Sequence, residues 1–129
     1  MTVIGPDELR YRDFPGRTTG DPFQEAGKGA STVRQVTIDY VPSRSPHLHP
    51  HSEEIVYVVS GRGRVWLDGV FHDVGPGSWY RIPAQTPHAT MADRGERMSL
   101  VCFFPHDDFA NNIEELDLIL EVNQEEDDD

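Results

Sequence analysis

Three histidines and one glutamate have residue types and spacings that could hold a metal ion. His47 and His49 are two residues apart, so an extended segment places both imidazoles on the same face. Glu54 follows the bend at Pro50, where a neighbouring strand could return its carboxylate to the same point, and His88 begins a later strand. Imidazole nitrogens and a carboxylate suit a divalent first-row metal, namely Fe, Mn, Ni, Zn or Cu. An H-x-H pair alone is a weak signal, because exposed loop histidines can have the same spacing.

Short strands must position these side chains. Val36, Ile38 and Tyr40 alternate with polar residues, which is the pattern of a half-buried strand. Asp68-Gly69 predicts a two-residue type I′ turn between two strands, because both residues tolerate the positive φ angles that this turn requires. Further apolar runs predict strands over residues 55–59, 64–67, 70–74, 79–82, 88–91 and 98–104.

The chain as a whole predicts an all-β fold. Seven or eight short strands, with no convincing helix before residue 108, favour a sandwich or barrel that avoids bare sheet edges. Residues 111–122 are ambiguous, because their apolar positions fit either a helix or an alternating strand. We expect an N-terminal arm over residues 1–31 with at most one short strand, around Val3 and Ile4. A barrel over 32–107 and an acidic segment over 108–129, disordered at its end, complete the expected organisation.

The composition excludes several classes of protein. The chain has 129 residues, enough for one domain, and a net charge of −12. Residues 107–129 carry 11 acidic residues and no basic one, so the remainder is nearly neutral. An acidic chain without a basic stripe does not favour nucleic acid or an anionic membrane as a partner. Cys102 is the single cysteine and no leader or membrane span is found, so we expect a cytoplasmic protein without an intrachain disulfide.

Two motifs resemble those of the cupin superfamily. The pattern H-x-H-x4-E-x6-G from His47 to Gly61 resembles its first motif, and G-x5-P-x4-H from Gly77 to His88 resembles its second. The fifteen residues between Gly61 and Gly77 match the short spacer of small single-domain cupins. The resemblance covers roughly residues 32–105. The chain departs from the family pattern of two glycines and an asparagine at three turn or scaffold positions: Val41-Pro42, Gln85 and Ala92.

The resemblance implies a cupin-type double-stranded β-helix, or jelly-roll barrel, with a metal centre. One divalent metal ion per chain would be held by His47, His49, Glu54 and His88. The implied function is an enzyme that acts on a small oxygenated metabolite, with an oxidoreductase of the dioxygenase type as the first choice. A non-redox lyase or isomerase and a non-catalytic metal- and ligand-binding cupin are the alternatives. Small cupins resemble one another in pairing through N-terminal arms, so we expect a homodimer.

Residues near the two motifs are further candidates. Glu53 competes with Glu54 for the role of carboxylate ligand, but the six-residue gap to Gly61 favours Glu54. Four residues are candidates for supporting the ligands or facing the substrate: His51, Tyr57, Trp79 and Arg81. An inward Arg81 would require an anionic substrate, because burying an unpaired charge is costly, whereas an outward Arg81 needs no such partner.

Overall fold

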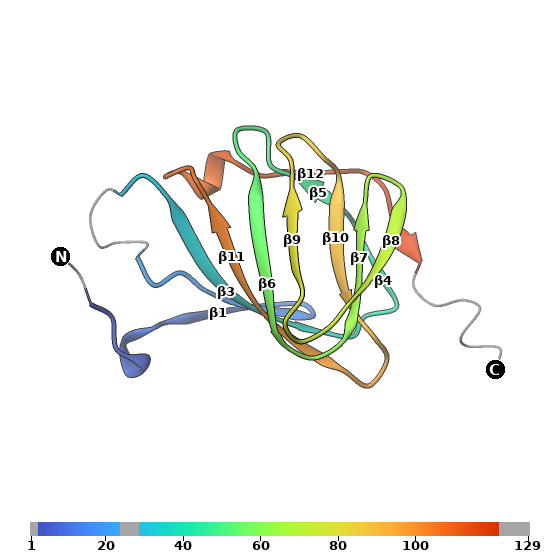
Figure 1. Ribbon diagram of the computed structural model, residues 1–129, viewed down its shortest axis with the longest axis horizontal. Helices are drawn as coiled ribbons and strands as arrows, with labels where there is room; N and C mark the ends of the chain where they lie inside the picture. The colour runs from blue at the N-terminus through green and yellow to red at the C-terminus, as the bar shows by residue number, and fades with distance from the viewer. Residues whose placement is uncertain (1–2, 24–28, 122–129) are drawn as a thin grey trace.

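The computed structural model describes residues 3–23 and 29–121, whose regular structure is almost entirely β-strand (Figure 1). The strands are β1 Tyr11–Phe14, β2 Arg17–Gly20, β3 Thr32–Asp39, β4 Ser43–Arg44, β5 His47–Leu48, β6 Glu54–Ser60, β7 Gly63–Leu67, β8 Val70–Val74, β9 Trp79–Ile82, β10 His88–Ala92, β11 Arg97–Phe104, β12 Glu114–Glu115 and β13 Leu120–Glu121. Two short 3-10 turns, η1 (Pro6–Glu8) and η2 (Phe109–Asn111), are the helical elements of the described residues. Within those residues, no helix has the length and hydropathy needed to cross a membrane.

The longer strands form two antiparallel sheets. The first has the order β1-β2-β3-β11-β6-β9 and the second the order β12-β5-β10-β7-β8, while β13 and β4 pair separately. Strands that are distant in sequence become neighbours, as where β11 lies between β3 and β6. The structure therefore confirms the predicted all-β fold of the jelly-roll type.

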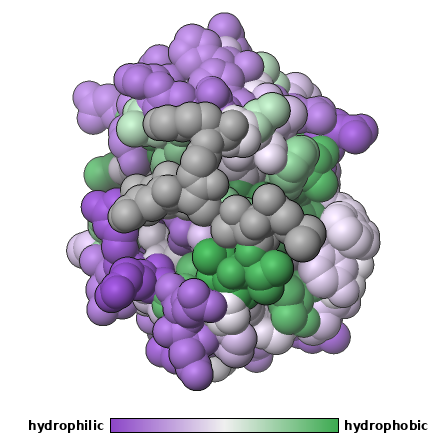
Figure 2. Space-filling view, turned by 90° about the vertical axis from the view of Figure 1, so that its left-hand side faces the viewer, coloured by the Kyte–Doolittle hydropathy of each residue, from purple (hydrophilic) through white to green (hydrophobic). Residues whose placement is uncertain are grey.

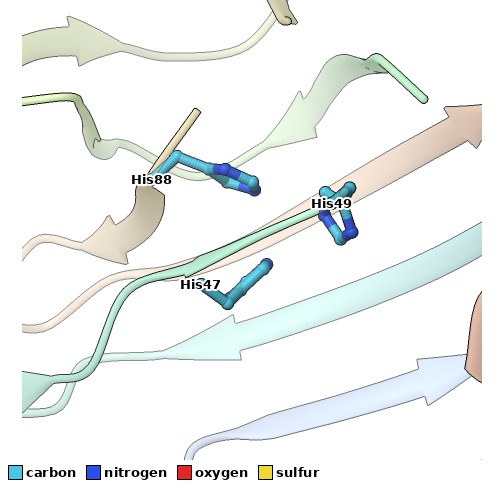
Figure 3. A group of neighbouring side chains, drawn as sticks. All are labelled: His47, His49 and His88. Carbon is cyan, nitrogen blue, oxygen red and sulfur yellow. The ribbon is translucent and has the colours of Figure 1, made fainter. Parts of the chain in front are cut away.

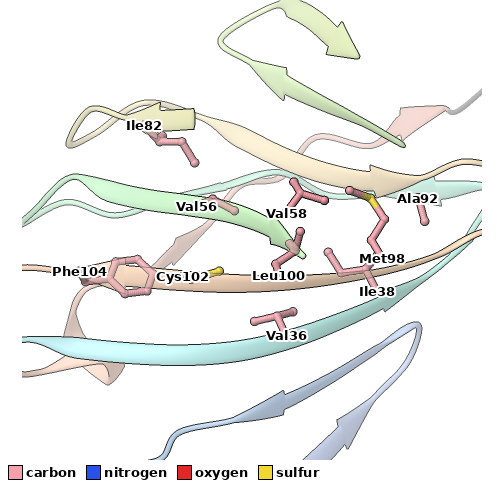
Figure 4. Packing of buried hydrophobic residues seen from close by; sticks show 10 residues of the cluster. All are labelled: Val36, Ile38, Val56, Val58, Ile82, Ala92, Met98, Leu100, Cys102 and Phe104. Carbon is pink, nitrogen blue, oxygen red and sulfur yellow. The ribbon is translucent and has the colours of Figure 1, made fainter. Parts of the chain in front are cut away.

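The main hydrophobic core is built from alternate residues of the strands. In β11, Met98 and Leu100 are at most 2% exposed, whereas Val101 and Phe103 are each 38% exposed. Fully burying an aliphatic side chain of this size contributes about 1.5–3 kcal/mol to stability. Ten buried residues form this cluster (Figure 4): Val36, Ile38, Val56, Val58, Ile82, Ala92, Met98, Leu100, Cys102 and Phe104.

Two turns have the glycine that their geometry requires. Asp68 and Gly69 have φ angles of 43° and 103°, as the predicted type I′ hairpin between β7 and β8 demands. Gly61, which ends the first motif, has a φ of +83°, and a Cβ there would collide with the carbonyl group of Arg97. A side chain at position 61 would therefore push β6 away from the start of β11.

The N-terminal segment contains two strands, which corrects our expectation of at most one short strand around Val3 and Ile4. The structure places no strand at those two residues. Instead β1 and β2 form a hairpin, and β2 pairs with β3 of the same chain, beginning with Arg17 opposite Ile38. This pairing satisfies backbone groups that β3 would otherwise expose at a sheet edge. All four side chains of β1 are exposed and do not alternate between apolar and polar, so pattern analysis did not detect the hairpin.

The segment after β11 forms neither a long helix nor a long strand. After η2, the short strand β12 pairs with β5, so that Glu115 lies opposite His47. The equally short β13 pairs with β4. The pairing of β12 covers the edge of β5, which carries part of the histidine cluster. The acidic end of the chain, for which we expect disorder, lies outside the described residues.

One side of the molecule carries an apolar area on its surface. This is the left-hand side of Figure 1, where the N-terminal segment lies, and Figure 2 shows hydrophobic residues gathered there among hydrophilic ones. Large hydrophobic side chains remain exposed in the N-terminal segment: Val3, Tyr11, Phe14 and Phe23. An apolar patch of this kind suits contact with a second copy of the chain. The expected homodimer stays a prediction.

Candidate metal centre

Three histidines from two adjacent strands and a loop converge on one point (Figure 3). His47 in β5 and His88 in β10 lie directly opposite each other in the strand register. His49 follows β5 with its side chain returned to the same side, as the two-residue spacing predicts. Ligand nitrogens of the three imidazoles lie within 4.8 Å of one another. Strand pairing therefore joins histidines that are about 40 positions apart in the sequence.

Glu54 completes the cluster at the first position of β6. Its Oε1 lies 3.1 Å from His49 Nε2 and 3.2 Å from His88 Nε2, and the residue is 6% exposed. Burial by itself raises the pKa of Glu54, but contacts with His49 and His88 outweigh burial and hold the pKa well below its usual value. Glu54 is therefore an ionised carboxylate among three imidazoles.

Glu53 points away from the cluster. Its carboxylate pairs with Arg81 Nε at 3.0 Å, and both side chains are substantially exposed. Adjacent residues of a strand face opposite sides, so only one of the two glutamates can share the inner face with Val56 and Val58. The structure places Glu54 there, as the gap to Gly61 suggested.

Backbone carbonyls fix the orientation of two of the imidazoles. His49 Nδ1 lies 2.7 Å from the carbonyl oxygen of Asn112, and His88 Nδ1 lies 2.9 Å from that of Thr86. Because a carbonyl oxygen only accepts, each Nδ1 carries the hydrogen and donates it. Each Nε2 is then left facing the carboxylate of Glu54. Metal-ligating histidines commonly have such an anchor on the other ring nitrogen.

The donor set fits a cation at the centre of the cluster. His88 Nε2 is buried without a hydrogen-bond partner, although Glu54 Oε1 is 3.2 Å away. A cation bound between Glu54 Oε1 and the Nε2 atoms of His49 and His88 would satisfy these buried atoms together. Burial, followed by the neighbouring His88 and His49, lowers the pKa of His47 well below its usual value. His47 therefore remains neutral and able to act as a ligand.

The cluster lies on the wall of a cavity of about 800 Å³. Apolar residues from β3, β6 and β11 form part of this wall: Val36, Ile38, Val56, Leu100, Cys102 and Phe104. The wall also has polar residues, among them Thr19, Arg17, Arg34, Arg44 and Thr90. A cavity of this size with a mixed lining suits a small polar molecule beside the cluster.

The four predicted supporting residues do not line this cavity, which corrects their assignment. Trp79 is 69% exposed and packs on Tyr57, with ring centroids 4.4 Å apart. Arg81 lies on the same outer face and pairs with Glu53, and exposed His51 stacks on His106 at 5.5 Å. Aromatic strand residues suit either face of a sheet, so their type did not reveal which side they occupy.

Asn112 is the supporting residue that pattern analysis missed. It is completely buried, and besides its carbonyl contact with His49 it makes two side-chain hydrogen bonds. Its Oδ1 accepts from the His51 amide at 2.8 Å, and its Nδ2 donates to Ser52 Oγ at 2.8 Å. A single asparagine some 60 positions from the histidine motif, in a polar segment, offers no signal in the sequence.

The antiparallel jelly roll and its buried cluster define the class of this protein. The family model described as "Cupin domain" matches residues 36–104, more than half of the chain, and this match includes all four clustered residues. The chain belongs to the cupin family.

Three proteins illustrate the likeness. The uncharacterized protein MJ1618 of Methanocaldococcus jannaschii is 45% identical over 42 residues, which covers 33% of this chain and 34% of MJ1618. The matched part thus spans about a third of that relative. KdgF from Halomonas sp. has a TM-score of 0.70 at 23% identity, covering 85% of this chain and 98% of KdgF. The polyketide cyclase RemF from Streptomyces resistomycificus has a TM-score of 0.71 at 19% identity, covering 95% and 85% respectively. At these identities the structural likeness shows the fold.

Proposed function

We propose that this chain is a metal-dependent cupin enzyme that acts on a small oxygenated metabolite. One observation carries the proposal: four side chains of metal-ligating types converge in the wall of a cavity of about 800 Å³. His47, His49, Glu54 and His88 are the proposed ligands of one divalent ion per chain. When bound, such an ion would supply Lewis acidity toward a substrate oxygen and, if it is Fe or Mn, a means of activating dioxygen.

The chain's own groups hold and orient this centre. The carbonyl groups of Asn112 and Thr86 hold the imidazoles of His49 and His88, so that both Nε2 atoms face the same point. The ionised carboxylate of Glu54 supplies negative charge there. The apolar part of the wall limits the access of water, which strengthens electrostatic interactions inside the cavity.

Two reaction classes are compatible with this arrangement. We propose dioxygenation first, because the three histidines and one glutamate resemble the cupin ligand set that implies this chemistry. A non-redox lyase or isomerase is the second candidate, supported by a hydroxyl pair at the cavity. Thr90 lines the cavity and lies 2.6 Å from the hydroxyl of Tyr80, whose pKa burial raises well above its usual value. This pair keeps its protons at neutral pH, so Thr90 offers a hydroxyl that can hydrogen-bond an oxygen of a bound substrate. The structural likeness to a polyketide cyclase supports the same candidate.

Metal analysis combined with oxygen uptake tests the proposal. We expect near-stoichiometric metal in the purified protein, and loss of most of this metal in His49→Ala. With a panel of catechols and 1,3-diketones, oxygen consumption that requires the metal would support dioxygenation. Substrate conversion that proceeds equally without oxygen would support the non-redox candidate. A protein that binds no metal in any preparation would refute the proposal, and a ligand bound without turnover would indicate a binding module instead.

A further inference from the structure

Two half-buried arginine side chains of the cavity wall have buried guanidinium nitrogens that make no hydrogen bond. Arg17 Nε, Arg44 Nε and Arg44 Nη2 are inaccessible to solvent and make no hydrogen bond. Within the described residues, neither arginine has a carboxylate at ion-pair distance. Arg34, on the same cavity, differs because its Nε lies 2.6 Å from Asp21 Oδ1. Arg17 has an aromatic contact instead, with its guanidinium carbon 5.9 Å from the centre of the Phe14 ring. Burying an unpaired charge is costly, so two such groups in one cavity call for a specific explanation.

The hairpin of β1 and β2 carries one of these arginines into the cavity. Arg17 lies opposite Ile38 and Thr19 opposite Val36, so both side chains share the inner face of β3. Thr19 is 2% exposed, and its Oγ1 is a fourth buried polar atom without a hydrogen-bond partner beside the three arginine nitrogens. Arg44 comes from β4, and all three residues line the cavity that contains the histidine cluster. One wall therefore presents several unused hydrogen-bond donors.

These charges influence each other and the cluster. Burial and then the charge of Arg34 lower the pKa of Arg17, while burial and then the charge of Arg17 lower that of Arg44. The charge of Arg17 also contributes to the lowered pKa of His47. Because the arginine pair and the histidine cluster line the same cavity, one small molecule in it can contact both.

None of the described acidic residues that line the cavity forms an ion pair with Arg17 or Arg44. Asp21 is engaged by Arg34, and Glu54 belongs to the histidine cluster. Glu115 attracts both Arg17 and Arg44 but is exposed and forms no ion pair with either. The other acids of the wall, Asp107 and Asp108, are also exposed.

We propose that Arg17 and Arg44, with Thr19 beside them, bind an oxyanion group of the substrate, which is therefore a small carboxylate or phosphate compound. Two guanidinium groups and a hydroxyl match the several acceptor oxygens of such a group, and charged hydrogen bonds are about twice as strong as neutral ones. The oxyanion offsets the cost of burying the arginines. This inference rests on the proposed function only for the other end of the substrate, which would face the metal centre.

Calorimetric titration with simple anions tests the inference on the full chain. Malonate and inorganic phosphate are the probes, and neutral malonamide is the control. Titrating the metal-stripped protein isolates the arginine pair, because malonate also chelates metals. We expect at least one anion to bind and malonamide to bind much more weakly. Arg17→Gln and Arg44→Gln should each weaken anion binding by about tenfold or more. The control Arg81→Gln, on the outer face, should leave the anion affinity unchanged.

Thermal stability without ligand provides the second measurement. If the arginines lack a partner in the fold, Arg17→Gln and Arg44→Gln should keep or raise Tm, because each removes an unmatched buried charge. A clear loss of Tm in both variants, reproduced by Glu115→Gln, would show that Glu115 is their partner and overturn the inference. The inference would also be overturned if malonate and malonamide bound equally well. The same holds if the anion affinity were unchanged in both Arg17→Gln and Arg44→Gln.

The two proposals fail separately in these experiments. A chain that binds no metal but still binds anions through Arg17 and Arg44 refutes the metal enzyme and retains the oxyanion site. A chain that binds metal normally but shows no arginine-dependent anion binding retains the metal enzyme and loses this inference. Tighter binding of malonate would assign a carboxylate substrate, and tighter binding of phosphate a phosphate ester, each within the proposed class.

Discussion

Replacing Asn112 by alanine would remove both side-chain hydrogen bonds that fasten this residue to the loop after His49. The lost partners are the amide of His51 and the hydroxyl of Ser52, both at 2.8 Å. The main-chain oxygen that accepts from His49 Nδ1 remains, but its position is no longer held by the side chain. The His49 imidazole would then lose its fixed orientation, which metal binding requires.

The structure gives the size of both expected effects. Each hydrogen bond contributes about 0.5–1.5 kcal/mol net, so the loss of two should lower the free energy of unfolding by about 1–3 kcal/mol. Asn112 is completely buried, so the space left by its amide adds to this cost. Loss of the partner that orients a metal-binding histidine weakens metal affinity by about 10–100-fold.

Two measurements on Asn112→Ala separate these effects. Urea denaturation of the metal-free protein gives the change in the free energy of unfolding, and competition with a chelator gives the metal Kd. Asn111→Ala is the matched control, because Asn111 is exposed and its side chain bonds only with Asp108 among the described contacts. The control should change neither quantity appreciably. If Asn112→Ala loses stability but keeps its metal Kd within about threefold of the unmodified chain, the orienting role is refuted.

Three further predictions concern the ligands, the pH dependence and the assembly. Glu54→Gln should empty the metal site and Glu53→Gln should leave it filled, as measured by metal analysis; the reverse result would show that the wrong carboxylate was assigned. Because neutral imidazoles bind metal and the pKa of His47 lies below its usual value of about 6.5, metal should be retained at neutral pH and released only below about pH 6.5. Retention that is unchanged down to about pH 4 would contradict histidine ligation. Light scattering should show a homodimer that survives deletion of residues 124–129 and is weakened by deletion of residues 1–14; a full-length monomer at micromolar concentration would contradict this.

Local sequence patterns were sufficient for most of the longer strands and one turn, and the two family motifs for the clustered residues. Period-two alternation of Val36 and Ile38 with polar residues predicts β3, because a strand that packs one face on a core must alternate. Asp68-Gly69 predicts its hairpin because few residue pairs tolerate those φ angles. The six-residue gap before the last glycine of the first motif favoured Glu54 over Glu53. Each of these patterns involves residues that are close in the sequence. Their relative positions in an extended strand are nearly constant, so the sequence is enough to predict them.

Only the tertiary structure revealed which residues complete the site. Asn112 contacts His49 and Arg17 enters the cavity because β-strands from distant parts of the chain pair with each other, and no spacing in the sequence encodes such pairing. The outward positions of Trp79 and Arg81 were undetermined for a related reason, since a short strand with large side chains at every position has no preferred inner face. Residue type thus specified the chemistry available to this cupin. The long-range strand pairing, which buries some of those groups beside one another and leaves others in water, decided which of them share the cavity.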